Sequence, residues 1–268
     1  MRERTLSESS RWNRIVGGMV VYNAAEFLER AIRSLLTVAD RIVIVDGPYE
    51  NYPHKSAHSD DGSLEIVQKY VDAGLPIKLI TKSTPWTDQM TKRNVYVDDA
   101  EVGDLIFILD GDCQVVAFDE AMERLRLSDA DGFQCTDIRP SQDGGCVRID
   151  WGNPYVIRKC EGMQYALNHY SLYDKEGRHV YLSPYRLEPL FNILQVYHWG
   201  ETRSPEKIAD NNAYYSTRVE YADGHEYFRC AKCKKDSVLA HGQRMICPHC
   251  GHWELQTVVH YDMPVKES

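Results

Sequence analysis

Residues 15–47 read IVGGMVVYNAAEFLERAIRSLLTVADRIVIVDG, and this stretch decides the fold. The run 15–23 is short, apolar and rich in β-forming residues, and 40–47 is a compact apolar strand that ends in Asp-Gly. Between them, residues 24–36 predict a helix, because apolar residues recur at helical spacing: Phe27, Leu28, Ala31, Ile32 and Leu35. The stretch therefore predicts a β-α-β unit.

The same alternation continues to residue 112. After a polar loop at 48–62, we expect helices and strands in turn at 62–74, 76–82, 85–100 and 103–112. The stretch 85–100 is expected to begin as a loop and to become helical. Continuously apolar strands are buried on both faces, and their alternation with helices predicts a mostly parallel sheet covered on both sides. Such sheets bind ligands at the carboxyl ends of their strands, where Asp46, Asp110 and Asp112 fall.

Beyond residue 117 the pattern loosens. We expect a helix at 118–128, strands within 130–140, 146–160 and 193–200, and a closing helix at 204–221. The stretch 140–190 is rich in Tyr, Arg and His and reads as irregular.

Length and composition limit the possible classes. The 268 residues allow one large domain with a small appendage, and 43% hydrophobic residues exclude a disordered chain. A net charge of −9 disfavours general nucleic-acid binding. No apolar run approaches the roughly 20 residues that a bilayer requires, and the charged segment 1–14 lacks the apolar region of a secretory signal. We therefore expect a cytoplasmic protein with reduced thiols.

Asp110 and Asp112 flank Gly111 after an apolar strand. A turn at this glycine would let both carboxylates approach one cation, and oxygen ligands suit Mg²⁺ or Mn²⁺ bound to substrate phosphates. A plain surface turn is the alternative, since Asp-Gly is common in turns. The context favours the cation, because Asp46 ends a second strand and the run Lys92-Arg93-Asn94 precedes the Asp110 strand.

These residues carry a family resemblance. The segments VVYNAAEFLERAIRSLL, RIVIVDG and KRNVYVDDAEVGDLIFILDGDCQV resemble the nucleotide-binding half of a GT-A fold glycosyltransferase of the family-two type. Further on, VYHWGETRSPEKIADNNAYY resembles the late strand and helix in which a histidine supplies a metal ligand. The resemblance covers most of residues 15–220 and implies an α/β, Rossmann-like GT-A fold.

The resemblance also implies residue roles. Asp110 and Asp112 would hold Mn²⁺ or Mg²⁺, with His198 completing the site, and Asp112 would be catalytic. The nucleotide sugar, expected to be UDP-linked, would be bound by Tyr22, Asn23, Asp46, Lys92, Arg93, Asn94 and Asp110. One departure is the loop after Asp46, which is longer than usual, so that Asp60-Asp61-Gly62-Ser63 arrives late.

A general base near the acceptor hydroxyl is harder to place. Relatives of this short type often have a His-Glu pair, but here His169 is followed by Tyr170. The candidates are His169, Asp137 and Glu188, each with a structural role as the alternative. A retaining mechanism stays open.

The strongest local signal is the cysteine quartet. Cys230, Cys233, Cys247 and Cys250 form two C-x2-C pairs separated by thirteen residues. Four thiolates in two knuckles predict a structural Zn²⁺ site, and the segment is similar to zinc ribbons. An iron–sulfur centre and disulfides are the alternatives. The other four cysteines read as small buried hydrophobes: Cys113, Cys135, Cys146 and Cys160.

The predicted organisation is an arm at 1–14, a GT-A domain at 15–222 and a β-rich zinc ribbon with a tail at 223–268. Residues 229–244 hold five basic residues and one acidic residue, a local net charge of +4 that suits a phosphate backbone, unless it is only a solvated surface. We expect a glycosyltransferase acting on an acceptor that could be a polymer, such as DNA with hydroxylated bases, a protein or a polysaccharide. The alternatives are a nucleic-acid-binding protein with a non-catalytic transferase-like domain and a nucleotidyltransferase.

Overall fold

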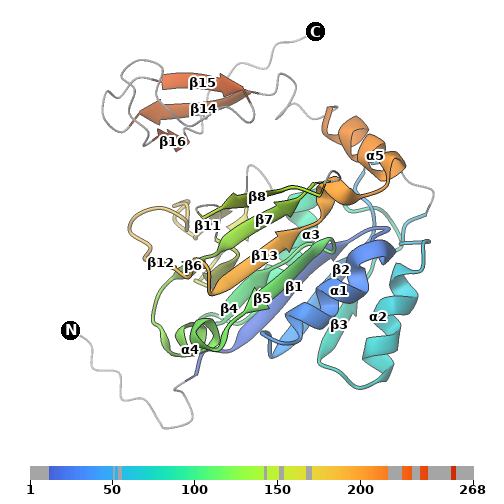
Figure 1. The fold of residues 1–268 in the computed structure, drawn as a ribbon, viewed down its shortest axis with the longest axis horizontal. Helices are drawn as coiled ribbons and strands as arrows, with labels where there is room; N and C mark the ends of the chain where they lie inside the picture. Colours follow the sequence, from blue (N-terminus) through green and yellow to red (C-terminus); the bar gives the residue numbers. More distant parts are fainter. Residues whose placement is uncertain are drawn as a thin grey trace. The chain divides into compact units, whose positions relative to one another are not determined.

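The computed structural model describes residues 12–50, 52–53, 56–141, 144–150, 154–166, 171–216, 225–230, 236–240 and 255–257 (Figure 1). Residue 201 and the residues after Asp210 are described by their backbone only. The chain divides into two compact units, Met1–Asp210 and Asn211–Ser268. The boundaries predicted at 14/15 and 222/223 stay predictions. None of the helices in the described ranges is long and apolar enough to cross a membrane.

The first unit is built on a seven-stranded sheet with the order β12-β6-β9-β4-β1-β2-β3. Its parallel part consists of β1 (Ile15–Val21), β2 (Arg41–Asp46), β3 (Ile77–Ile80) and β4 (Leu105–Ile108). The remaining strands are β9 (Val156–Arg158), β6 (Gly132–Gln134) and β12 (Leu187–Pro189). The strand β9 is antiparallel to its neighbours β4 and β6, and β12 is parallel to β6. The predicted α/β fold with a mostly parallel sheet is confirmed.

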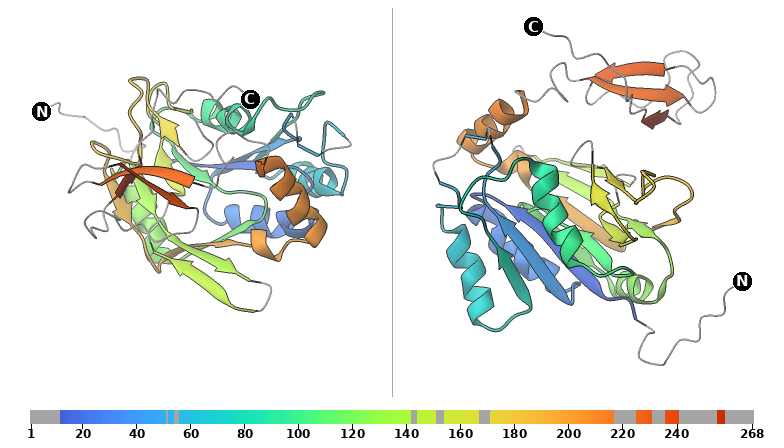
Figure 2. Two further views of the ribbon diagram at one scale, coloured as in Figure 1. Left: turned by 90° about the horizontal axis from the view of Figure 1, so that it is seen from above. Right: turned by 180° about the vertical axis from the view of Figure 1, so that it is seen from behind.

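Helices cover both faces of this sheet, as predicted. The helices α1 (Ala25–Leu35) and α2 (Ser63–Asp72) lie on one face, and α3 (Gln89–Asp99) lies on the other, as the view from behind shows (Figure 2). Alternate residues of β1 serve the two sides: Met19 belongs to the core under α1, and Val20 to the core under α3. Burial on both sides explains why the strand is apolar throughout.

Two glycines in β1 let the helices approach closely. A Cβ at Gly17 would lie 2.6 Å from Leu35 of α1, and a Cβ at Gly18 would lie 2.4 Å from the ring of Tyr96 in α3. The pair therefore sets the spacing of the helices on both faces of the strand.

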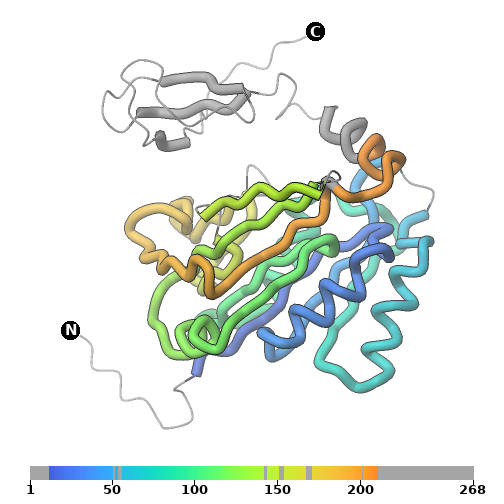
Figure 3. Tube along the Cα trace, viewed as in Figure 1, coloured from blue at the N-terminus to red at the C-terminus, as the bar shows by residue number. Residues whose placement is uncertain are grey.

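A second sheet packs on the α1 side, with the order β5-β13-β7-β8 (Figure 3). Its strands are β5 (Cys113–Ala117), β13 (Leu194–His198), β7 (Thr136–Pro140) and β8 (Cys146–Ile149). The helix α4 (Asp119–Leu127) follows β5. After β13 come a short 3₁₀ turn, η2 (Gly200–Thr202), and then α5 (Pro205–Ser216).

Three sequence expectations need correction here. The strand expected within 130–140 is two strands, β6 and β7, which belong to different sheets, and the one within 146–160 divides in the same way into β8 and β9. The stretch 140–190 is not wholly irregular, since it also holds β10 (Gln164–Tyr165), β11 (Leu172–Tyr173) and β12. Strands of two or three residues are too short to leave a periodic pattern.

The described part of the second unit contains the end of α5 and a three-stranded antiparallel sheet with the order β15-β14-β16. Its strands are β14 (His225–Cys230), β15 (Asp236–Ala240) and β16 (Leu255–Thr257). These strands agree with the β-rich character expected of this part of the chain.

Candidate functional site

The predicted site residues come together at one edge of the main sheet. The strands β4, β1 and β2 are neighbours, and their carboxyl ends lead into Asp110, Tyr22 and Asp46 respectively. This is the edge at which open α/β sheets bind ligands.

Asp112 is the buried centre of this edge. Its side chain is 2% exposed, and its Oδ2 lies 3.3 Å from Nε2 of His198 and 2.6 Å from Nη2 of Arg203. Despite these neighbours, Oδ2 has no hydrogen-bond partner of acceptable geometry among the described residues. One ligand atom each of Asp112, Cys113 and His198 lie within 4.8 Å of one another.

Pairing between β5 and β13 builds this cluster. His198 stands opposite Cys113 in the antiparallel register, and the amide of Trp199 donates to the carbonyl of Asp112 at 2.9 Å. Gly200 keeps the space open, because a Cβ there would lie 3.0 Å from Oδ2 of Asp112. Two segments far apart in sequence thus meet at one carboxylate.

The cluster fits a divalent cation. A carboxylate and an imidazole suit Mn²⁺, and a buried carboxylate oxygen without a hydrogen bond is available as a ligand. Burial raises the pKa of the Cys113 thiol well above its usual range, so the group stays protonated at neutral pH. Asp112 and His198 are therefore the residues that would hold the ion.

Asp110 faces Arg93. Nη2 of Arg93 donates to both carboxylate oxygens of Asp110, at 2.8 and 2.9 Å, while Nη1 approaches the hydroxyl of Tyr96 at 3.3 Å. Asp110 does not belong to the Asp112, Cys113 and His198 cluster. The Arg93 guanidinium is buried, so it fixes the position of the Asp110 side chain.

Lys92 joins the ends of two strands. Its Nζ donates to the carbonyls of Val21 at 2.7 Å and of Gly47 at 2.5 Å, and its side chain is fully buried. Loss of solvent lowers the pKa of this amine to about 7. Asn94 also bonds to backbone, exchanging two hydrogen bonds with Tyr165 at 3.1 and 2.7 Å. Lys92 thus links the ends of β1 and β2, and Asn94 links α3 to β10.

The loop that follows β2 returns to the end of β1 at residues 59–61. The hydroxyl of Ser59 donates to Asp46 at 2.5 Å, and Asp60 and Asn23 exchange hydrogen bonds of 2.9 and 3.0 Å. Asp61 accepts the amide of Ala25 at the start of α1. The additional residues after Gly47 therefore lengthen the loop, but Asp60 and Asp61 still contact the residues after β1.

The candidate bases lie in different places. Asp137, on β7, accepts two hydrogen bonds from Arg139 through Oδ2, and its buried Oδ1 has no hydrogen-bond partner among the described residues. Glu188 is held by Arg124 and Ser128 at the far edge of the main sheet. His169 lies outside the described residues.

The zinc prediction also lies largely outside them. Cys230 ends β14 and is described by its backbone, whereas Cys233, Cys247 and Cys250 are not among the described residues. Of the other cysteines, Cys113 and Cys135 are buried as expected. The expectation was wrong for Cys146, which is exposed on β8, and Cys160 is only partly buried.

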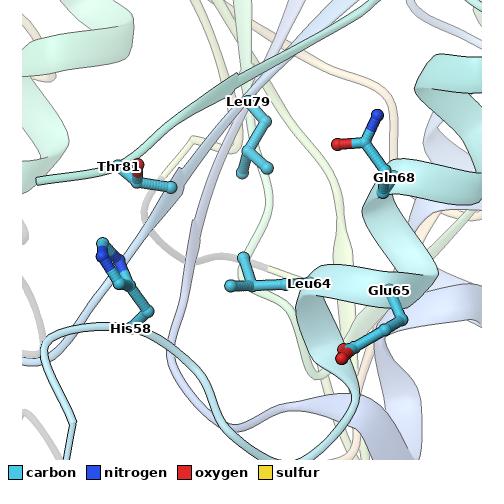
Figure 4. Close-up of a pocket in the computed structure, with 6 residues that line it drawn as sticks. All are labelled: His58, Leu64, Glu65, Gln68, Leu79 and Thr81. Atoms are coloured by element: carbon cyan, nitrogen blue, oxygen red, sulfur yellow. The ribbon is translucent and has the colours of Figure 1, made fainter.

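A depression of about 310 Å³ opens between α2, the end of β3 and the segment after β2 (Figure 4). None of the predicted site residues lines it, although Nδ1 of His58 lies 3.8 Å from Oδ2 of Asp46. The residues that line it are His58, Leu64, Glu65, Gln68, Leu79 and Thr81.

Sequence reasoning missed two cations at the site. Arg203 contacts Asp112, and Nζ of Lys207 donates to the carbonyl of Tyr22 at 3.1 Å. The same Nζ lies 5.2 and 5.5 Å from the ring centres of Tyr22 and Tyr52. The signal was available, because both residues closely follow His198 in the segment that carries the family resemblance.

Residues 18–144 match the model of the family described as glycosyl transferase family 2. The matched segment is 127 of the 268 residues, slightly under half of the chain. It contains Asp46, Arg93, Asp110 and Asp112, whereas His198 and Arg203 lie beyond the matched segment.

Solved structures of S. aureus TarS and of GalNAc-T7 are similar to this chain. S. aureus TarS is 16% identical over 73% of this chain and 38% of its own, with a TM-score of 0.48. TarS 1-349 in complex with UDP-GlcNAc is 21% identical over 49% and 36%, with a TM-score of 0.39. GalNAc-T7 with UDP, GalNAc and Mn²⁺ is 14% identical over 79% and 49%, with a TM-score of 0.45. This chain thus spans less than half of each. None of the curated proteins matches it.

Proposed function

We propose that the protein is a metal-dependent glycosyltransferase that moves a sugar from a nucleotide-sugar donor, expected to be UDP-linked, to an acceptor hydroxyl. The observation that carries this proposal is the buried Oδ2 of Asp112, which lies beside His198 at the strand edge of the unit that contains the segment matched by the family 2 model. Mn²⁺ or Mg²⁺ at this place supplies Lewis-acid stabilisation of the departing diphosphate.

The other residues of the site would bind the nucleotide or position the side chains around it. Tyr22 and Asn23 follow β1, and Asp46 ends β2, so all three stand beside the proposed nucleotide position. Arg93 holds Asp110, and Lys92 fixes the ends of β1 and β2 relative to each other. For the base, Asp137 has support from its buried carboxylate oxygen without a hydrogen bond. His169 remains the second candidate.

The acceptor belongs to the same proposal. The positive charge of residues 229–244 favours a polymeric acceptor with a phosphate backbone, such as DNA with hydroxylated bases. The cysteine pairs, as a structural zinc site, would stabilise the segment that presents this charge.

The donor site is tested by thermal stabilisation across a panel of nucleotides and nucleotide sugars, with and without Mn²⁺. A ligand at one hundred times its dissociation constant adds about 2.7 kcal/mol of stability. We expect a Mn²⁺-dependent shift with one nucleotide class in the wild type, and its loss in Asp112→Asn together with loss of transfer.

The matched control is Asp98→Asn, which makes the same chemical change on an exposed carboxylate of α3 and should leave the shift intact. No shift with any nucleotide, or an equal shift in Asp112→Asn, would contradict the assignment of the strand edge as the donor site.

A further inference from the structure

Arg203 occupies a place that conflicts with the proposed cation. Its Nη2 lies 2.6 Å from Oδ2 of Asp112, and this is the oxygen that faces Nε2 of His198 at 3.3 Å. A cation held between Asp112 and His198 would use the same oxygen.

A guanidinium and a divalent cation on the same carboxylate oxygen compete with each other, because both are positively charged. Arginine stays charged at every accessible pH, and like charges a few ångströms apart in a largely buried site repel strongly. The Arg203 side chain is 23% exposed and that of Asp112 is 2% exposed, so water screens this repulsion poorly. Cation binding at Oδ2 therefore weakens the ion pair between Arg203 and Asp112 and favours its release.

The released guanidinium would remain beside a second cation. Lys207 lies four residues further along, in α5, and its pKa is lowered first by loss of solvent and then by the charge of Arg203. The acidic groups whose charges act on Lys207 are Asp61, Asp210 and Asp112. Asp61 is already engaged with the amide of Ala25 and the hydroxyl of Ser63, so it does not provide a vacant partner for Arg203.

We propose that Arg203 is a diphosphate-binding residue, and that it stays paired with Asp112 until a divalent cation displaces it from that carboxylate. This inference rests on the proposed function, since it assigns the leaving group of the donor to Arg203. Guanidinium groups bind phosphates through paired hydrogen bonds, so the exchange replaces a carboxylate partner with a phosphate partner. The cation and the anion would then bind in sequence, and each would complete the other's site.

The test compares Arg203→Gln with the wild type in the full-length protein. Mn²⁺ alone is measured first, by the loss of its free electron paramagnetic resonance signal. The variant is expected to bind Mn²⁺ about 3–10 times more tightly, because the competing charge is gone. With Mn²⁺ at saturation, inorganic pyrophosphate and UDP are expected to bind about 10–100 times more weakly, because a charged phosphate contact is lost.

Opposite directions in the two measurements are the signature of the exchange, since a misfolded site would weaken both. Arg203→Lys keeps the charge on a flexible stem and should fall between the wild type and Arg203→Gln. The matched control is Arg30→Gln, because Arg30 is exposed and stacks over Trp199 at 4.7 Å without contacting Asp112. This control is expected to change either affinity by less than about twofold.

Two results overturn the inference: unchanged or weaker Mn²⁺ binding in Arg203→Gln, or unchanged pyrophosphate binding in the presence of Mn²⁺. Failure of the proposed function looks different. If pyrophosphate follows the expected pattern but no nucleotide or nucleotide sugar binds to the wild type, the anion exchange stands and the donor assignment falls.

Discussion

At the scale of single residues, the site depends on buried polar groups whose partners are specific. Arg93 holds Asp110, and Lys92 holds the carbonyls of Val21 and Gly47. A buried carbonyl that loses its donor costs about 1–3 kcal/mol, so groups of this kind fix the geometry of the strand ends. The proposed nucleotide position is thus shaped by side chains that need not touch the nucleotide.

Lys92 gives a prediction at this scale. Lys92→Met keeps the length of the side chain and removes both hydrogen bonds, so it is expected to lower the free energy of unfolding by about 2–4 kcal/mol in urea titrations. In the folded protein the pKa is about 7, below that of an unfolded lysine, so the unfolded chain binds more protons above pH 7. The stability of the wild type relative to Lys92→Met should therefore rise between pH 7 and 9.

The control for Lys92 is Lys82→Met, which removes an exposed ammonium that lies 4.8 Å from the centre of the Trp86 ring. A pH-independent difference between wild type and Lys92→Met would contradict the depressed pKa.

At the scale of elements, β1 is positioned by the two helices that press on it from opposite sides. The residue that faces Gly18 is Tyr96. Its hydroxyl donates to the hydroxyl of Tyr165 at 2.9 Å and accepts a hydrogen bond from Nη1 of Arg93 at 3.3 Å. Helix packing on this strand is thereby connected to the side chain that orients Asp110. The core and the site share these contacts.

Gly18→Ala tests this connection. The new methyl group would overlap the Tyr96 ring, and overpacking of this kind costs about 1–3 kcal/mol. Gly17→Ala is the matched control, because its methyl group meets the flexible end of Leu35. We expect the larger loss of stability, and the larger loss of nucleotide binding, in Gly18→Ala. Equal losses in both variants would show that Tyr96 does not transmit the change.

The elements also show where sequence reasoning succeeded. The strands and helices up to Ile108 were predicted to within a few residues, including the loop that precedes α3, because buried strands and amphipathic helices leave regular patterns. The short strands between 140 and 190 were missed, since their positions depend on pairing with distant segments. Asp112 and His198 were predicted from the two segments that resemble the glycosyltransferase family. Cys113 was not recognised as a site residue, because only the register between β5 and β13 sets it opposite His198. Arg203 closely follows His198 in sequence, but its contact with Asp112 depends on the fold.

At the scale of the whole molecule, the chain joins a transferase-like unit to a second unit with an antiparallel sheet. The second unit comprises residues 211–268, which is too few to form a large hydrophobic core, and a metal would supply the missing stability. The separation predicts that the two activities, donor binding and acceptor binding, can be lost independently.

Cys230→Ser with Cys247→Ser tests this separation. The wild type is expected to contain about one zinc per chain by ICP-MS, and the double variant well under one. The variant should lose salt-dependent DNA binding and retain Mn²⁺-dependent nucleotide binding. Cys146→Ser changes an exposed thiol of the first unit and should leave both properties intact. A full zinc content in the double variant would contradict the four-thiolate site.

Cys113 has a consequence for metal selectivity. Its sulfur lies beside a carboxylate and an imidazole. If zinc displaced the thiol proton, the three groups would form a donor set that zinc takes in preference to magnesium or manganese. Zinc bound there would be held too tightly, and with too few open positions, to exchange with a nucleotide-bound ion. Excess zinc is thus expected to inhibit transfer, so the ion that we propose as the stabiliser of one unit would inhibit the other.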